Sequence, residues 1–166
     1  MNIQSLSAKY LVRPLKEADI PEVFALCQGN PLYYQFCPPA VTKESIKRDM
    51  AALPEGKTLA DKYYLGYYSD GLLIAVMDLI AGYPHAETAF IGFFMMNQHW
   101  QGKNIGTDII TQACRYLKRV GFSEVRLGYA KGNSQSEAFW LKNHFEKTGA
   151  ENQAEYYVSV YMRRGL

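Results

Sequence analysis

The chain has 166 residues, of which 48% are hydrophobic, 13 are tyrosine and 8 are phenylalanine. This length and composition are sufficient for one domain with a packed core and exclude a disordered protein. Its formal charge of +2 is spread without long runs of one sign, which excludes the strongly basic surface typical of nucleic-acid-binding proteins. No segment approaches the roughly 20 apolar residues of a membrane helix, and the N-terminus lacks a secretory signal, so we expect a soluble, cytoplasmic protein without a membrane partner.

Cysteine and histidine side chains are too scattered along the chain for a metal site. The cysteines form no CxxC pair, and the three histidines make no metal-ligand spacing with them. An odd number of cysteines fits a reducing compartment better than a disulfide framework. We therefore expect no metal, and we expect three structural thiols, which are Cys27, Cys37 and Cys114.

One strand and two helices are predicted before residue 54. Residues 10–15 alternate apolar and polar side chains, as a strand does. Residues 19–29 begin with Asp-Ile-Pro-Glu, which signals a capped helix start, and they end at a glycine. Residues 42–53 begin with Thr-Lys-Glu-Ser and stop before a proline, which predicts a second helix. The connection at 29–41 has too many prolines for regular structure and too many aromatic residues for an ordinary solvated loop.

The middle of the chain predicts an antiparallel meander of three strands. Residues 62–69 and 72–82 flank an Asp-Gly pair, which is one of the stronger short-range signals of a hairpin. Residues 88–96 form the third apolar run. Gly92 inside this run suggests a β-bulge or a close approach of another chain segment.

The last third alternates helices and strands. Residues 105–120 carry apolar side chains at helical spacing, and residues 124–130 alternate as a strand. A strand, a helix and a strand in close succession predict two parallel neighbouring strands with a right-handed crossover. Residues 134–137 form a capping box that opens another helix, the region ends at Gly149, and residues 155–164 supply a final strand. This order predicts an α/β fold with a mixed sheet in one domain, residues 1–166.

The polar turn QGKNIG, residues 101–106, joins the third strand of the meander to the next helix. A helix N-terminus presents unpaired N–H groups and about half a positive charge, so it binds anions where no side chain blocks the approach. Gly102 and Gly106 leave the turn open, Lys103 adds a cation, and Thr107 adds a hydroxyl. The alternative is that the two glycines only ease a bend between the strand and the helix.

Two other kinds of phosphate-binding turn do not fit. The GxxxxGK[ST] pattern of nucleoside triphosphate sites is absent. A dinucleotide GxGxxG turn would follow the first strand of a parallel unit, whereas this turn follows the last strand of a meander.

The turn resembles the signature of the GNAT superfamily of acyl-CoA-dependent N-acyltransferases, which is Gln or Arg, two residues, Gly, one residue, then Gly or Ala. Gln101, Asn104 and Gly106 stand at these places, so Asn replaces the middle glycine, and Asn tolerates left-handed backbone angles. The order of elements from residue 10 onward also matches. Further residues stand where the family tends to have N-x-x-A-x-x-x-Y-x-K-x-G-F: Asn133, Ser136, Trp140, Lys142 and Phe145.

The resemblance implies a GNAT-like fold, in which a largely antiparallel, twisted sheet is flanked by helices and its two parallel central strands splay apart. It also implies that the pyrophosphate of acetyl-CoA lies on the amides of residues 102–107 and the pantetheine arm along residues 95–97, where a bulge leaves backbone groups unpaired. Plain core packing is the alternative for the methionines there, and turn stabilisation is the alternative for Asn133. The cofactor-binding candidates are Met95, Met96, Asn97, Gln101, Gly102, Lys103, Asn104, Ile105, Gly106, Thr107, Asn133, Trp140 and Lys142.

The implied reaction moves an acetyl group directly to a primary amine, and its acid and base are open. The family often has a Tyr as general acid where this chain has Trp140, and indole cannot donate a proton in this way. Tyr129 and Tyr156 are candidate substitutes; otherwise the thiolate takes a proton from solvent, or the protein is a non-catalytic acyl-CoA sensor. Candidates for the base are Glu87, which ranks first, Asp78, His85 and Tyr83.

The acceptor is expected to be a small-molecule or peptide amine, and a homodimer is left open. Aromatic residues of the connection after the first helix, Tyr33, Tyr34 and Phe36, are expected to wall the acceptor groove. Their rings would attract a cationic amine by roughly 0.5–2 kcal/mol, or they form the packing core of a lid.

Overall fold

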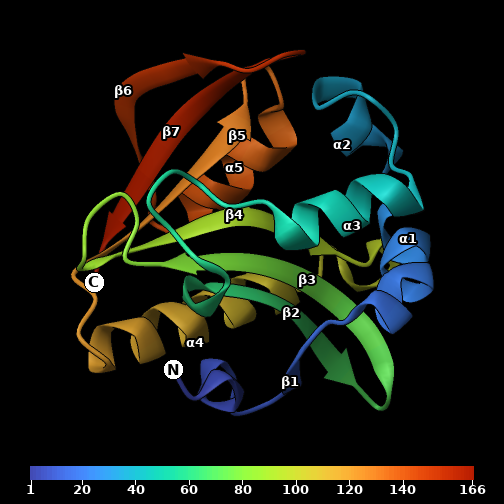
Figure 1. Ribbon diagram of the computed structural model, residues 1–166, viewed down its shortest axis with the longest axis horizontal. Helices are drawn as coiled ribbons and strands as arrows, with labels where there is room; N and C mark the ends of the chain where they lie inside the picture. The colour runs from blue at the N-terminus through green and yellow to red at the C-terminus, as the bar shows by residue number, and fades with distance from the viewer.

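A computed structural model describes residues 1–166 and has a twisted sheet of seven strands with helices on both faces (Figure 1). The strands lie in the order β1-β2-β3-β4-β5-β7-β6. In chain order the elements are β1 Leu11–Pro14, α1 Ile20–Gln28, α2 Pro31–Phe36, α3 Lys43–Ala51, β2 Lys62–Ser69, β3 Leu72–Ala81, β4 Thr88–Met96, α4 Ile105–Arg119, β5 Glu124–Ala130, α5 Ser134–Lys142, β6 Glu146–Gln153 and β7 Val158–Gly165. None of the helices combines the length and the apolarity needed to cross a bilayer.

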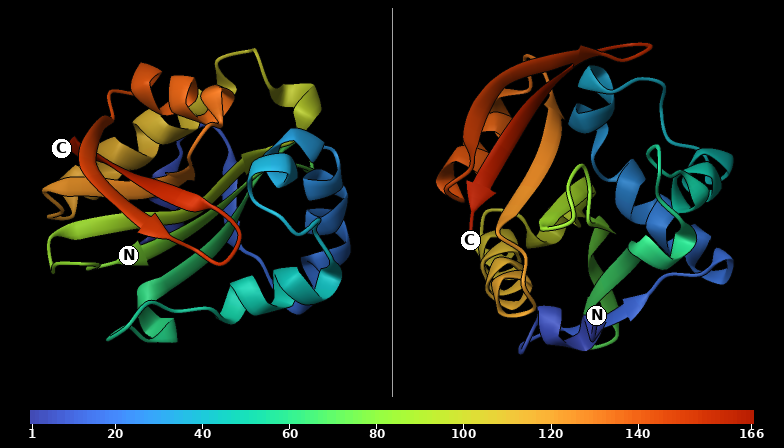
Figure 2. Two further views of the ribbon diagram at one scale, coloured as in Figure 1. Left: turned by 90° about the horizontal axis from the view of Figure 1, so that it is seen from above. Right: turned by 60° about the vertical axis from the view of Figure 1, so that its left-hand side comes forward.

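The sheet is mixed, and its one parallel pair opens at one end. Every neighbouring pair is antiparallel except β4 and β5, where Thr88–Ile91 runs beside Glu124–Leu127. β4 continues to Met96, but its pairing with β5 ends at Ile91, so the two strands separate (Figure 2). The predicted fold class, with splayed parallel central strands, is confirmed.

A β-bulge lies at Gly92, beside the point where the strands separate. Asp78 of β3 faces Phe93 and Leu79 faces Ile91, so Gly92 is the extra residue of β4. A Cβ atom at Gly92 would lie 2.9 Å from Oδ2 of Asp78, so a larger residue there would have to displace this carboxylate. The prediction of a bulge at Gly92 is confirmed. The expected bulge at residues 95–97 is wrong, because the pairing with β3 is regular there.

Helices cover both faces of the sheet (Figure 2), and an apolar core holds them on each face. α4 and α5 cover the face with the larger core, where Ile110 and Leu117 pack with Leu127 of β5. α1 and α3 cover the other face, where Val23 and Ile46 belong to a smaller cluster. The predicted helices at 19–29, 42–53 and 105–120 are confirmed to within a few residues.

Two segments differ from the sequence-based expectation. The connection at 29–41 contains the helix α2, because Pro31 occupies a first-turn position, where its missing N–H costs no hydrogen bond. β6 was not predicted as a separate strand, and Gly149 lies inside it at a φ of 85° rather than ending the region. All residues of β6 are exposed, so no alternation of apolar and polar side chains marks the strand. The final strand begins at residue 158 rather than 155.

Candidate functional site

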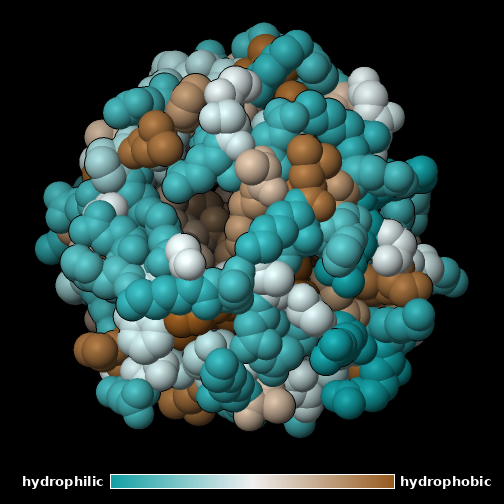
Figure 3. Space-filling model, turned by 180° about the vertical axis from the view of Figure 1, so that it is seen from behind, coloured by the Kyte–Doolittle hydropathy of each residue, from teal (hydrophilic) through white to brown (hydrophobic).

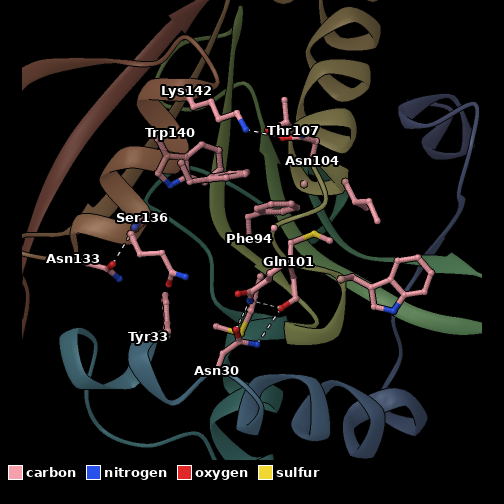
Figure 4. Close-up of a pocket in the computed structure, with 18 residues that line it drawn as sticks. Asn30, Tyr33, Phe94, Gln101, Asn104, Thr107, Asn133, Ser136, Trp140 and Lys142 are labelled. Atoms are coloured by element: carbon pink, nitrogen blue, oxygen red, sulfur yellow. Dashed lines mark hydrogen bonds between the residues drawn. The ribbon is translucent and has the colours of Figure 1, made fainter.

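A pocket of about 290 Å³ opens between the end of β4, the turn before α4 and the start of α5 (Figure 4). The face seen in Figure 3 is hollowed near its centre, and the bottom of the hollow is apolar. The pocket brings together most of the predicted cofactor-binding residues, which are Met95, Met96, Gln101, Gly102, Asn104, Ile105, Gly106, Thr107, Asn133, Trp140 and Lys142. Asn97 and Lys103 do not line it.

The turn before α4 is built from left-handed residues. Gly102 has a φ of 71° and Asn104 a φ of 58°. Asn is among the non-glycine residues that tolerate this region, which explains why it can replace a glycine here. Its side chain also binds α5, because Lys142 Nζ donates a hydrogen bond of 2.7 Å to Asn104 Oδ1 (Figure 4). The turn and the end of α5 therefore hold each other across the pocket mouth.

The first turn of α4 presents free backbone donors to this pocket. The first N–H of the helix with a backbone partner is that of Asp108, which donates to the Asn104 carbonyl at 3.0 Å. No acceptor of the protein pairs with the N–H groups of Ile105, Gly106 and Thr107. No acidic side chain lines the pocket, and Lys142 adds a positive charge. Helix dipole, free amides and lysine together suit an anionic ligand.

Gly106 packs closely against its neighbours at the bottom of the turn. A Cβ atom there would lie 3.1 Å from Cε2 of Phe139 and 3.4 Å from Cγ of Met96. Phe139 stacks on Phe94 at a centroid distance of 5.8 Å and meets Trp140 edge to face at 4.9 Å. These rings form an aromatic wall of the pocket. Neither Phe94 nor Phe139 was among the residues predicted from the sequence to bind the cofactor.

Asn30 and Gln101 tie the end of α1 to the end of β4 (Figure 4). Gln101 Nε2 donates to Asn30 Oδ1 at 2.6 Å and to the Met96 carbonyl at 3.2 Å. Asn30 Nδ2 donates to the same carbonyl at 3.0 Å. Gln101 therefore acts through its side chain in positioning the turn. Asn30 was missed because only the folded chain brings residue 30 to residue 101.

The two predicted asparagines outside the turn both cap helical segments. Asn97 Oδ1 accepts a hydrogen bond of 3.0 Å from the N–H of His99, so its side chain serves a short 3₁₀ turn. Asn133 Oδ1 accepts one of 3.0 Å from the N–H of Ser136 and caps α5 (Figure 4). The cap is thus Asn133 rather than the expected Ser134. Asn133 nevertheless lines the pocket while it stabilises this turn.

A second cavity of about 60 Å³ lies where β4 and β5 separate. It is lined on β4 by residues 91–94 and on β5 by residues 127–130, with Cys37 and Tyr157 beside them. The two cavities adjoin, because they share the lining residues Tyr33, Phe94, Asn133, Ser136 and Trp140.

Only one of the three predicted acceptor-groove aromatics reaches these cavities. Tyr33 of α2 lines both, and its ring meets Phe93 at 5.7 Å. Tyr34 packs against the smaller core and meets Tyr33 at 5.0 Å, as the packing alternative expected. Phe36 lines neither cavity.

The candidates for acid and base are widely separated. Tyr129 lines the second cavity, and its hydroxyl donates a hydrogen bond of 2.6 Å to Glu137 Oε2. Burial and this hydrogen bond raise the pKa of Tyr129. Glu87 is exposed and precedes β4, at the end of the strand opposite the pocket, where its carbonyl accepts from the Ser123 N–H. The structure therefore does not bring Glu87 to the site, and Tyr156 is 58% exposed and lines neither cavity.

The thiols are poor nucleophiles in this fold. Burial raises the pKa of Cys27 and of Cys114 to about 11, and burial also raises the pKa of Cys37, which lines the second cavity. Each thiol is therefore protonated near neutral pH. No group of three or more His, Cys, Asp or Glu side chains is placed to hold a metal ion.

Solved structures show the same fold. An acetyltransferase from Thermus thermophilus aligns with a TM-score of 0.77 and 18% identity, over 95% of this chain and 97% of that one. A paia N-acetyltransferase from Thermoplasma acidophilum, solved with coenzyme A, aligns at 0.68 and 21%, over 95% and 99%. An acetyl transferase from Salmonella typhimurium that modifies the N-terminal serine of a 50S ribosomal subunit protein aligns at 0.75 and 19%, over 97% of both chains.

The sequence itself carries the family assignment. No curated protein matches the chain closely enough to count as a relative. The profile of the acetyltransferase (GNAT) domain, however, matches residues 9–146, which include the splayed strands, the turn and α5. The chain therefore belongs to the GNAT acetyltransferase family.

Proposed function

We propose that this protein transfers an acetyl group from acetyl-CoA directly to a primary amine. The observation that carries the proposal is the set of unpaired amides at residues 105–107, which face a pocket free of acidic side chains beside the gap between β4 and β5. Membership of the family and the neighbour solved with coenzyme A support acetyl-CoA as the donor.

The turn and the free edge of β4 would hold the donor. The amides of Ile105, Gly106 and Thr107 would bind its pyrophosphate, with Lys142 at the mouth. The Asn97 N–H bonds to Ile74 of β3. Because ladder hydrogen bonds alternate along a strand, the N–H groups of residues 94 and 96 point the other way, toward the gap. They would bind the linear pantetheine arm.

Bound acetyl-CoA would supply the acetyl group as an activated thioester. The amine would reach it through the second cavity, at whose lining Tyr33 and Trp140 meet the donor pocket. Direct attack needs no covalent enzyme intermediate, in agreement with the protonated thiols. Of the two candidate hydroxyls only Tyr129 lines this cavity, so it is the proposed proton donor to the leaving thiolate, with solvent as the alternative.

The first acceptors to test follow from one of the solved neighbours. Because the Salmonella neighbour modifies the N-terminal serine of a ribosomal protein, peptides with free N-termini come first among the acceptors to test. Small amines such as polyamines and amino acid amides come next.

Binding and transfer are tested in one series. Acetyl-CoA at a hundredfold excess over its dissociation constant should stabilise the fold by roughly 2.7 kcal/mol, measured as a higher melting temperature. Release of the CoA thiol is then followed across the panel of amines. An unchanged melting curve at millimolar acetyl-CoA would refute the assignment of the pocket.

A non-catalytic acyl-CoA sensor is the second candidate, and Trp140 favours it because the family often has a tyrosine there. A sensor predicts the same stabilisation by acetyl-CoA but no amine-dependent release of thiol. The second step of the series therefore separates the two.

Lys103→Ala should weaken acetyl-CoA binding without harming the fold. Lys103 is exposed, lies outside the pocket lining and has its Nζ 6.0 Å from the centroid of Trp100. Its loss should change the free energy of unfolding by less than about 0.5 kcal/mol. Affinity should fall at low salt, and the difference from wild type should shrink as salt screens the charge. Lys118→Ala, at the exposed far end of α4, is the matched control. Equal losses in both variants would mean a general charge effect.

A further inference from the structure

Asn30 joins the end of α1 to the start of α2. Its N–H donates to the Cys27 carbonyl at 3.0 Å, and its Nδ2 donates to the Leu26 carbonyl at 2.9 Å. Its own carbonyl accepts a hydrogen bond of 3.2 Å from the N–H of Tyr33, in the first turn of α2. The position of Asn30 therefore sets where α2 begins.

The side chain of Asn30 also reaches the free edge of β4. The Met96 carbonyl points toward the gap, like the Met96 N–H, because the next residue bonds to β3. Asn30 Nδ2 and Gln101 Nε2 both donate to this carbonyl, at 3.0 and 3.2 Å, and Gln101 Nε2 also donates to Asn30 Oδ1 at 2.6 Å. Both amides line the first pocket (Figure 4). A donor arm that lies along the end of β4 would therefore lie against this pair.

The short helix α2 depends on its contacts with the rest of the fold. It has six residues, none of them fully buried, and a helix of this length is not stable by itself in water. Its Tyr33 and Tyr34 rings pack against the smaller core. Tyr33 also lines both cavities, and its side chain points from α2 toward the start of α5 (Figure 4). A shift of α2 would therefore move a wall of the space that the amine must cross.

We propose that Asn30 is a positioning residue that transmits the placement of the turn before α4 to Tyr33, and so to the acceptor amine. The inference rests on the acetyl transfer proposed above. Acetyl-CoA on the amides of residues 105–107 fixes the turn, Gln101 in this turn holds Asn30, and Asn30 holds the first turn of α2. The amine then meets a wall that is already in place, so donor and acceptor sites are coupled through Asn30.

Hydrogen exchange of the full chain tests this link without turnover. Acetyl-CoA should slow exchange of residues 31–37 by about fivefold or more in wild type, and this slowing should be lost in Asn30→Ala. Gln4→Ala is the matched control. Gln4 is also an amide that joins two segments, since it donates to the Tyr10 carbonyl at 3.1 Å and accepts from the Val12 N–H at 3.1 Å, beside the edge strand β1. This variant should keep the slowing in full.

Steady-state kinetics test the role in transfer. The probe is the amine of the panel that wild type acetylates fastest. Asn30→Ala should raise KM for this amine about tenfold, with kcat and the dissociation constant of acetyl-CoA changed less than about threefold. The donor is held nearly as well because Gln101 keeps its bond to the Met96 carbonyl. Gln101→Ala should weaken acetyl-CoA binding as well, since Gln101 belongs to the turn itself.

The exchange and kinetic results can each overturn the proposal. Equal slowing of exchange in wild type and Asn30→Ala would refute the link, and so would bound acetyl-CoA that leaves wild-type exchange unchanged. A wild-type KM for the amine in Asn30→Ala would refute the role in transfer. A wild-type protein that binds acetyl-CoA and acetylates no amine would end the proposed function, while the exchange comparison still decides the link.

A second variant covers the case in which Asn30→Ala does not fold. If circular dichroism shows this variant to be unfolded, Gln101→Ala replaces it, because it breaks the same link and leaves Asn30 in place. Exchange is then compared at saturating acetyl-CoA. Loss of the slowing in Gln101→Ala supports the link, and slowing equal to that of wild type refutes it.

Discussion

Gly106→Val is expected to lower the affinity for acetyl-CoA by about 100-fold, which corresponds to roughly 3 kcal/mol. Its branched side chain would begin at a Cβ atom only 3.1 Å from Phe139 and 3.4 Å from Met96. Either the aromatic wall or the turn must then move, and the amides of residues 105–107 move with the turn. The fold should also lose about 1–3 kcal/mol through overpacking. Isothermal titration with acetyl-CoA measures the first effect and urea unfolding the second.

Gly165→Val is the matched control for this substitution. Nothing lies within 4 Å of a Cβ atom at Gly165, which ends β7 far from the turn and has no positive φ. This variant should bind acetyl-CoA as wild type does. A folded Gly106→Val protein with wild-type affinity would mean that the two glycines only ease a bend.

Trp140→Ala should cost about 3–5 kcal/mol of the free energy of unfolding and lower the melting temperature by roughly 10 °C. The indole is 6% exposed, and its ring packs at 4.9 Å from Phe139, 5.1 Å from Phe145 and 6.0 Å from Phe94. Alanine would leave a cavity among these rings, beside both pockets. Urea unfolding followed by circular dichroism measures the loss, and an effect below about 1 kcal/mol would contradict this packing role.

Trp140→Phe separates packing from chemistry at the same position. Phenylalanine fills much of the space and, like indole, cannot serve as the proton donor. Turnover with a good acceptor should therefore stay close to wild type. A loss of several orders of magnitude with normal acetyl-CoA affinity would show that the indole itself positions a reacting group.

The sequence predicted the fold well where side-chain patterns report local structure. The meander follows from its apolar runs and the Asp-Gly pair between the first two of them, and α4 follows from helical periodicity. The bulge follows from Gly92, a residue whose missing side chain marks a close approach. β6 has no buried face, so its residues carry no alternation and the strand depends on pairing with β7. The helix α2 was missed because the prolines of residues 29–41 were taken to exclude regular structure, although Pro31 opens a helix.

The part of the site that could be predicted is the turn, because its backbone conformation requires particular residue types. Gly102, Asn104 and Gly106 mark the turn through the angles and spaces they need. Partners from distant segments, such as Asn30 and Phe139, depend on how the elements pack, and no short-range pattern encodes them. Glu87 was ranked first as the base because it lies next to the central strand β4. The sequence does not show which end of that strand faces the gap, and Glu87 lies at the other end.

The fate of the acetyl group tests most directly whether the protein transfers it from acetyl-CoA to an amine. Acetyl-CoA and the best amine of the panel are incubated with the protein, and the acetylated amine, identified by mass spectrometry, is compared with the CoA thiol released. Acetyl transfer predicts equal amounts of acetylated amine and thiol, both abolished in Gly106→Val at low acetyl-CoA concentration. Tight binding of acetyl-CoA with no acetylated amine for any member of the panel would contradict acetyl transfer and would support a non-catalytic acyl-CoA sensor.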